Sequence, residues 1–132
     1  MVSSNPSPRG TNKLRLLIVE DNNFFRQTLR ESLQASFPEI VIDEAVNGVE
    51  ALERVDAFAP DLILMDMRLP GESGLGLTKK IKATYPDIII FILTNYDSRE
   101  SREAASRYGA DRYIAKDSVK RVEELIKSYF KI

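Results

Sequence analysis

The stretch Leu-Ile-Leu-Met-Asp at residues 62–66 places four apolar side chains in a row and ends in a carboxylate. A short unbroken apolar run of this kind is typical of a strand that is covered on both faces, as in a parallel sheet. Similar runs occupy residues 14–19, 40–42 and 88–93, and a weaker one occupies residues 113–115. The sequence therefore predicts a sheet of buried strands.

The segments between these runs carry apolar residues at helical spacing. The repeats are Phe25, Leu29, Leu33 and Phe37; Leu52 with Val55; Leu77, Ile81 and Tyr85; and Val122, Ile126 and Phe130. Strands that alternate with helices favour an α/β fold with a parallel sheet and right-handed crossovers. We therefore expect β-α units repeated five times along the chain.

The fourth expected helix, residues 98–108, differs from the others because its apolar candidates are few: Ala104, Ala105 and Tyr108. It should bury little area and be held weakly, either as a solvated surface helix or as a mobile switching element. Asp97 with Glu100 resembles a capping box for this helix. The last helix can be capped by Asp117 or Ser118.

The length of 132 residues and the composition, 43% hydrophobic and 30% charged, indicate one globular domain. We interpret residues 1–12, rich in Ser, Pro and Asn, as a flexible N-terminal tail before a domain at 13–132. The sequence contains no apolar stretch that could span a membrane and no signal-peptide pattern, so we expect a cytoplasmic protein. With 19 basic and 20 acidic residues, direct nucleic-acid binding by this chain is not expected.

The sequence contains no Cys and no His, which excludes several kinds of chemistry. Disulfides, thiolate nucleophiles, Cys- or His-ligated metals and Ser-His-Asp triads all require one of these residues. The chemistry of the chain must therefore come from carboxylates, lysines, arginines and hydroxyls.

Polar residues follow the apolar runs, and ligands of open parallel sheets bind beyond the carboxyl ends of the strands. These residues are Glu20, Asp21, Asp66, Thr94 and Lys116. Each has an ordinary alternative explanation, since Asp21 or Asn22 can cap a helix and a lysine can simply be solvated. Together, however, three carboxylates, a hydroxyl and an ammonium on one edge form a specific set. Clustered carboxylates predict a hard divalent cation such as Mg²⁺, and an aspartate can act as a phosphoryl-accepting nucleophile.

At these residues the chain resembles bacterial response-regulator receiver domains, from about residue 13 to residue 130. The resemblance rests on LLIVEDN at 16–22, PDLILMDMRLPGESG at 60–74, FILTN at 91–95 and GADRYIAKD at 109–117. It is strongest to receivers of the nitrate-regulator type that precede helix-turn-helix output domains, because Lys-Asp follows the fifth strand. The resemblance implies a (βα)5 doubly wound, flavodoxin-like sandwich with a five-stranded parallel sheet in the order 2-1-3-4-5.

The resemblance also implies roles for individual residues. Asp66 would be the phosphoacceptor, and Mg²⁺ would be held by Asp21, Asp66 and the backbone carbonyl of Arg68, with Glu20 acting through water. Thr94 and Lys116 would contact phosphoryl oxygens. Tyr113 matches the switch aromatic that turns inward when Thr94 moves, so the face of helix 4, strand 5 and helix 5 would change for dimerisation or output control. The partner would be a sensor histidine kinase or a phosphotransfer protein.

Three positions depart from the commonest pattern of the family. Arg68 is often Asn there, and Tyr96 is bulky, so we expect the two to crowd the path of attacking water and lengthen the life of the acyl phosphate, unless both point to solvent. Asn95 replaces a small residue and would narrow access for small phosphodonors.

Other functions fit the sequence less well. A phosphatase of the haloacid-dehalogenase type would need Asp-x-Asp, whereas residues 66–68 read Asp-Met-Arg. A flavodoxin-like cofactor carrier would meet repulsion at Glu20 and Asp21, and a P-loop motif is missing from the sequence. A phosphate-independent scaffold is disfavoured because all the expected site residues are present. Whether the chain stands alone or belongs to a longer regulator stays open.

Overall fold

The computed structural model describes residues 13–132, so the expected tail at 1–12 lies outside the described residues. A five-stranded parallel sheet has the order β2-β1-β3-β6-β7. Its strands are β1 (Arg15–Val19), β2 (Val41–Ala45), β3 (Leu62–Asp66), β6 (Ile89–Thr94) and β7 (Arg112–Ala115). Numbered within the sheet alone, this is the predicted order 2-1-3-4-5, so the predicted fold is confirmed.

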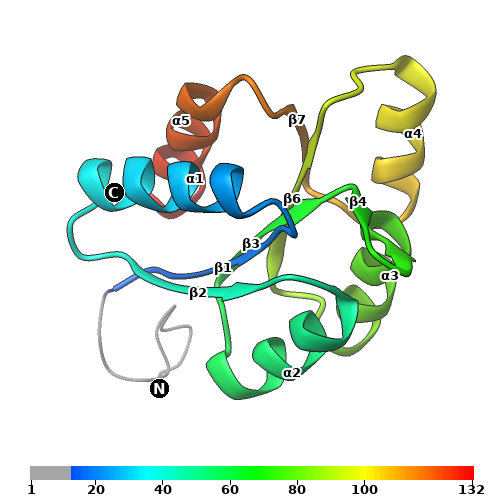
Figure 1. Ribbon diagram of the computed structural model, residues 1–132, viewed down its shortest axis with the longest axis horizontal. Helices are drawn as coiled ribbons and strands as arrows, with labels where there is room; N and C mark the ends of the chain where they lie inside the picture. The colour runs from blue at the N-terminus through cyan, green and yellow to red at the C-terminus, as the bar shows by residue number, and fades with distance from the viewer. Residues whose placement is uncertain (1–12) are drawn as a thin grey trace.

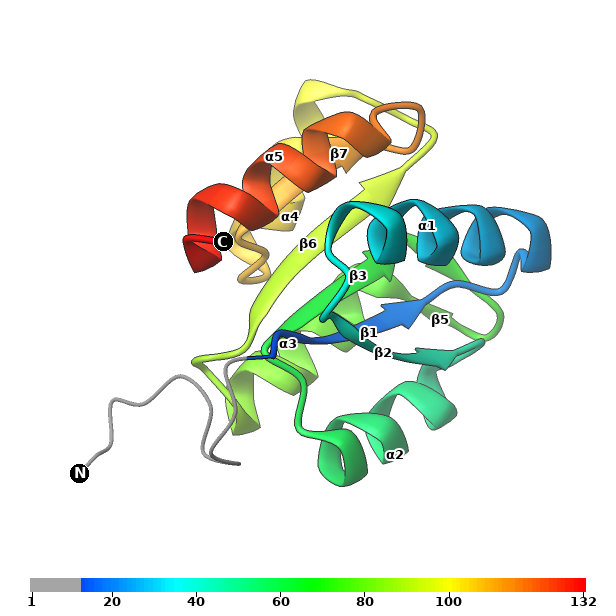
Figure 2. The ribbon, with the colours of Figure 1, turned by 90° about the vertical axis from the view of Figure 1, so that its left-hand side faces the viewer.

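Helices cover both faces of the sheet (Figures 1 and 2). One face carries α1 (Asn23–Ser36) and α5 (Val119–Phe130), and the other carries α2 (Gly48–Phe58), α3 (Gly74–Thr84) and α4 (Arg99–Arg107). None of these helices, which lie within residues 13–132, is long and apolar enough to cross a bilayer.

Successive residues of the central strands pack into separate cores on the two faces of the sheet. In β1, Leu16 and Ile18 join the core under α1 and α5, whereas Leu17 and Val19 join the core under α2, α3 and α4. All four side chains are fully buried. Burial on both faces explains why these strands have unbroken apolar runs instead of alternating ones.

Two helices bury fewer of their apolar candidates than the sequence suggested. In α2 the buried residues are Gly48, Ala51 and Val55, while Leu52 is 39% exposed because it lies one position around the helix from Ala51. In α4 the buried residue is Ala105, so this helix offers the core one small side chain. The expectation of a weakly anchored fourth helix agrees with this burial.

The expected helix caps are partly wrong. Ser98, not Asp97, caps α4, and its Oγ accepts a hydrogen bond from the Ser101 amide at 3.1 Å. Asp97 instead forms an ion pair with Arg102. Ser118 precedes α5, as expected, but among the described residues its side chain makes no cap hydrogen bond.

Strand β2 is longer than the three apolar residues at 40–42 suggested, because it continues through Asp43, Glu44 and Ala45. It lies at the edge of the sheet, where charged side chains can reach arginines and solvent. A second, two-stranded sheet of β4 (Arg68–Leu69) and β5 (Glu72–Ser73) was not expected. Its turn requires Gly71, whose φ of 77° is in the left-handed region that favours glycine.

Candidate functional site

A pocket of about 520 Å³ lies beyond the carboxyl ends of the central strands. The structure brings together all the residues that the sequence placed at the strand ends, together with three neighbours from the loops. The lining includes Glu20, Asp21, Asp66, Thr94 and Lys116, with Arg68, Asn95 and Tyr96. Tyr113 is next to this group: its hydroxyl contacts the sulfur of Met67 and the backbone carbonyl of Tyr96.

Asp66 is the last residue of β3, and its side chain is held rigidly. It is 6% exposed, and the strand before it is buried at every position. Its Oδ1 accepts a hydrogen bond from the Arg68 amide at 3.2 Å and lies 3.2 Å from the ammonium of Lys116. Within the described residues both contacts fall on Oδ1, which leaves Oδ2 as the oxygen that can react.

Lys116 links two of the three carboxylates. Its Nζ lies 2.8 Å from Glu20 Oε1 as well as 3.2 Å from Asp66 Oδ1, and it sits 4.9 Å from the centre of the Phe25 ring. Burial by itself lowers the pKa of Lys116, but the hydrogen bond and charge of Glu20, with the charge of Asp66, outweigh it and raise the pKa overall. Lys116 is therefore a fixed positive charge.

Glu20 is almost completely buried, with 2% of its surface exposed. Its Oε2 accepts a hydrogen bond from the Asn22 amide at 3.0 Å, and Asn22 in turn caps α1 by accepting from the Phe25 amide at 2.8 Å. Burial raises the pKa of Glu20, and the hydrogen bonds from Lys116 and Asn22 reduce this rise without cancelling it.

Glu20, Asp21 and Asp66 form an acidic group in which one oxygen of each lies within 4.8 Å of the others. Two of the three side chains are buried and Asp21 is exposed, so the group faces solvent on one side. Within the described chain it is countered by the ammonium of Lys116, which pairs with two of the carboxylates. The donor set therefore suits a hard cation, which prefers carboxylate oxygens.

Thr94 and Tyr113 are connected through one backbone carbonyl. The Thr94 hydroxyl donates to the carbonyl oxygen of Tyr96 at 3.1 Å and accepts from the Tyr96 amide at 2.9 Å. The Tyr113 hydroxyl donates to the same carbonyl oxygen and lies 3.8 Å from Met67 Sδ. A movement of the Thr94 side chain away from the Tyr96 carbonyl would therefore leave that acceptor to Tyr113 alone.

The side chains of Arg68 and Tyr96 meet across the mouth of the pocket. The guanidinium carbon of Arg68 lies 4.4 Å from the centre of the Tyr96 ring, a cation–π contact. Both residues are exposed, but they stack on one another instead of pointing separately into solvent. Asn95 lies between Thr94 and Tyr96 in the chain and also lines the pocket.

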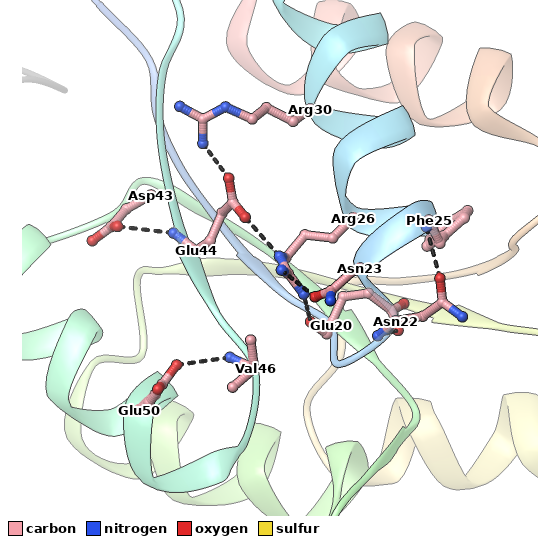
Figure 3. A network of polar contacts seen from close by, with 10 residues as sticks. All are labelled: Glu20, Asn22, Asn23, Phe25, Arg26, Arg30, Asp43, Glu44, Val46 and Glu50. Atoms are coloured by element: carbon pink, nitrogen blue, oxygen red, sulfur yellow. Dashed lines mark hydrogen bonds and ion pairs between the residues drawn. The ribbon is translucent and has the colours of Figure 1, made fainter.

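Sequence reasoning missed the residues that support the acidic pair, Glu20 and Asp21, from the side of β2. Arg26 of α1 and Glu44 of β2 form an ion pair beside Glu20 (Figure 3). Nothing in the apolar pattern indicates this contact, because the two residues are far apart in the sequence and β2 was expected to end before Glu44.

The fold and this pocket place the chain among the open-sheet α/β domains that bind ligands at the carboxyl ends of their strands. Within that class, the chain belongs to the response regulator receiver domain family, which matches it over residues 16–129. It is thus a receiver domain of two-component signal transduction. The resemblance expected from the four sequence motifs is confirmed.

Two relatives illustrate the range of this similarity. The chemotaxis protein CheY of Halobacterium salinarum is 38% identical over 102 residues, which cover 77% of this chain and 83% of CheY. The oxygen regulatory protein NreC of Staphylococcus carnosus is 38% identical over 106 residues, 80% of this chain and 49% of NreC. This chain therefore matches about four-fifths of the length of CheY but about half of the length of NreC.

The chain is also similar to a solved structure that contains a phosphorylated aspartic acid. A response regulator from Burkholderia pseudomallei superposes with a TM-score of 0.79 at 29% identity, over 90% of this chain and 69% of that one. That structure is described as containing a phosphorylated aspartic acid, a calcium ion and citrate.

Proposed function

We propose that this chain is the phosphoacceptor of a two-component system and that a sensor histidine kinase or phosphotransfer protein transfers a phosphoryl group to Asp66. The observation that carries the proposal is the surroundings of Asp66, a buried carboxylate that lines the pocket and whose Oδ1 accepts from the Arg68 amide and lies 3.2 Å from the ammonium of Lys116. The phosphorylated aspartic acid of the Burkholderia pseudomallei regulator supports this assignment. The proposed domain spans residues 13–132 and acts in the cytoplasm.

In the transfer, Asp66 Oδ2 attacks the phosphorus of the donor's phosphohistidine. The new O–P bond makes an acyl phosphate while the N–P bond breaks, and the imidazole leaves and takes up a proton. Lys116 is placed to pair with one phosphoryl oxygen, since its Nζ lies 3.2 Å from Asp66 Oδ1. This chain catalyses its own phosphorylation and dephosphorylation and acts on no other substrate.

The acidic group would hold Mg²⁺ through Asp21, Asp66 and the backbone carbonyl of Arg68, with Glu20 acting through water. When bound, Mg²⁺ neutralises charge on the transferred phosphoryl group. The three carboxylate oxygens within 4.8 Å of one another support this ligand set.

Magnesium should stabilise the folded chain. We expect MgCl₂ to raise the midpoint of thermal unfolding, by an amount equivalent to about 2.7 kcal/mol at one hundred times its Kd. In Asp21→Asn the rise should be much smaller, because a charged ligand is lost. Asp87→Asn, which changes an exposed carboxylate outside the acidic group, is the matched control and should respond like the wild type. An equal Mg²⁺ response in Asp21→Asn would contradict the ligand set.

We propose that Thr94 transmits the effect of phosphorylation to the surface formed by α4, β7 and α5. A phosphoryl oxygen on Asp66 offers the Thr94 hydroxyl a charged acceptor in place of the Tyr96 carbonyl. Tyr113 shares that carbonyl and would then repack inward. The weakly anchored α4 lies beside β7, so the face of α4, β7 and α5 would shift for homodimerisation or output control. DNA binding would belong to an output domain outside this chain.

Arg68 and Tyr96 are proposed to prolong the life of the acyl phosphate by covering the approach of water. Replacing both with serine should remove the stacked pair and speed hydrolysis of phosphorylated Asp66 several-fold, with each single variant in between. Phosphate release after removal of the donor measures the rate. An unchanged rate in the double variant would refute this role.

Asn95 is proposed to restrict small phosphodonors, and Asn95→Ala should accelerate labelling by such donors.

The proposed function is tested by intact mass after incubation with Mg²⁺ and either a small acyl-phosphate donor or a histidine kinase. The wild type and Asp87→Asn should each gain one phosphoryl group, and Asp66→Asn should gain none. Absence of addition to the wild type with both kinds of donor, or equal addition to Asp66→Asn, would overturn the proposal.

A further inference from the structure

One arginine of α1, Arg26, joins three parts of the fold beside Glu20 (Figure 3). Arg26 donates from Nη1 to the backbone carbonyl of Glu20 at 2.8 Å, from Nε to Glu44 Oε1 at 2.6 Å and from Nη2 to Asn23 Oδ1 at 2.6 Å. Its side chain is 15% exposed. A planar guanidinium with three engaged donors has little freedom to move. A lysine ammonium at the end of a flexible chain could not hold the same three acceptors in this arrangement.

The partner of Arg26 on the sheet is itself fixed. Glu44 of β2 accepts from Arg26 through Oε1 and pairs with Arg30 of the next helical turn through Oε2. The Glu20 amide donates to the carbonyl of Ala45, the last residue of β2, at 3.0 Å. Strand β2 therefore holds Glu20 on its amide side directly, and on its carbonyl side through Glu44 and Arg26.

The carbonyl that Arg26 binds belongs to the peptide between Glu20 and Asp21. The orientation of this peptide sets the direction in which the Asp21 side chain leaves the backbone, while Glu20 stays buried. In the described chain, Arg26 is therefore connected to the acidic pair through the backbone and not through the carboxylates.

We propose that Arg26 is a positioning residue that sets the geometry of Glu20 and Asp21 for their divalent cation, with Glu44 holding Arg26 in place. This inference rests on the proposed function of the pocket and names a residue that supports it. Groups that orient metal ligands typically change metal affinity or activity by about 10- to 100-fold when they are lost.

Positioning and simple charge make opposite predictions for Arg26. A nearby positive charge repels Mg²⁺, so a charge effect alone would make Arg26→Met bind Mg²⁺ more tightly and leave Arg26→Lys unchanged. Positioning predicts weaker binding in both variants, because neither methionine nor lysine can bridge the three acceptors. Arg30→Met is the matched control, since Arg30 pairs with the same Glu44 from the same helix.

The test is isothermal titration of the metal-free chain with MgCl₂, with thermal unfolding without metal as a separate measure of stability. We expect about a tenfold or greater loss of Mg²⁺ affinity in Arg26→Met, a smaller loss in Arg26→Lys, and an affinity within about twofold of the wild type in Arg30→Met. If Arg26→Met does not fold, Arg26→Lys, which keeps the charge, decides the question.

The inference is overturned if the Arg26 variants bind Mg²⁺ as tightly as the wild type or more tightly, or if Arg30→Met loses as much affinity as Arg26→Met. Absence of Mg²⁺ binding by the wild type would instead overturn the proposed metal site itself, and this inference with it. The two failures are therefore distinguishable in one set of titrations.

Discussion

Replacing Gly74 with alanine is expected to destabilise the chain strongly and to displace Asp66. A β-carbon on Gly74 would lie 2.1 Å from the backbone carbonyl oxygen of Asp66 and 3.0 Å from Met67 Cα. These are backbone atoms that cannot rotate away, and the Gly74 amide also donates to the Met67 carbonyl at 2.8 Å. We expect a loss of about 3 kcal/mol in the free energy of unfolding, at the upper end of the usual cost of overpacking.

Chemical denaturation measures this loss, and phosphorylation of the folded fraction measures the displacement of Asp66. Gly76→Ala is the matched control in the same helix, because its new β-carbon would meet the Ser73 hydroxyl at 3.3 Å and no backbone atom among its nearest contacts. Alanine in a helix is also favoured over glycine. A Gly74→Ala chain as stable and as readily phosphorylated as Gly76→Ala would show that the turn after β3 does not fix Asp66.

Replacing Lys116 with methionine should have opposite effects on metal binding and on phosphoryl transfer. The variant loses the ammonium that pairs with Glu20 and Asp66, so the acidic group should bind Mg²⁺ more tightly. Phosphorylation should become about 10²- to 10³-fold slower, the usual cost of removing one group that stabilises developing charge. The pKa of Glu20, already raised by burial, should rise further without the hydrogen bond from Lys116.

Magnesium titration and the initial rate of labelling by a small acyl phosphate measure these two effects. Lys82→Met is the matched control, because Lys82 also forms a partly buried ion pair, with Asp111 at 2.8 Å. Asp111 binds the amide of Ile90 near the start of β6, at the other end of the strand from Thr94. If Lys116→Met were labelled as fast as Lys82→Met, the role of Lys116 in transfer would be wrong.

Features of the fold that depend on local pattern could be predicted from the sequence. The buried strands have apolar runs because both faces of the sheet are covered, and the runs of β1, β3, β6 and β7 end where the pocket begins. In a parallel sheet those ends meet at one edge, so the convergence of Asp66, Thr94 and Lys116 follows from topology.

Features that depend on contacts between distant residues could not be predicted. Strand β2 pairs with β1 through Glu44 and Ala45, and the Glu44 carboxylate is neutralised by Arg26 and Arg30, neither of which is distinguishable in the sequence from a solvated arginine. The cap of α4 is Ser98, one residue later than expected, while Asp97 pairs with Arg102 instead. The stacking of Arg68 on Tyr96 likewise joins β4 to the loop after β6, two segments that only the folded sheet brings together.

The central claim is that Asp66 carries the phosphoryl group, and borohydride reduction of the phosphorylated chain tests it most directly. Borohydride converts an aspartyl phosphate to homoserine, and peptide mass spectrometry then locates the converted residue. We predict homoserine at position 66 in chain treated with Mg²⁺ and a phosphodonor, and aspartate there in untreated chain. Homoserine at another position, or unconverted Asp66 in a chain that has gained a phosphoryl group, would contradict the account.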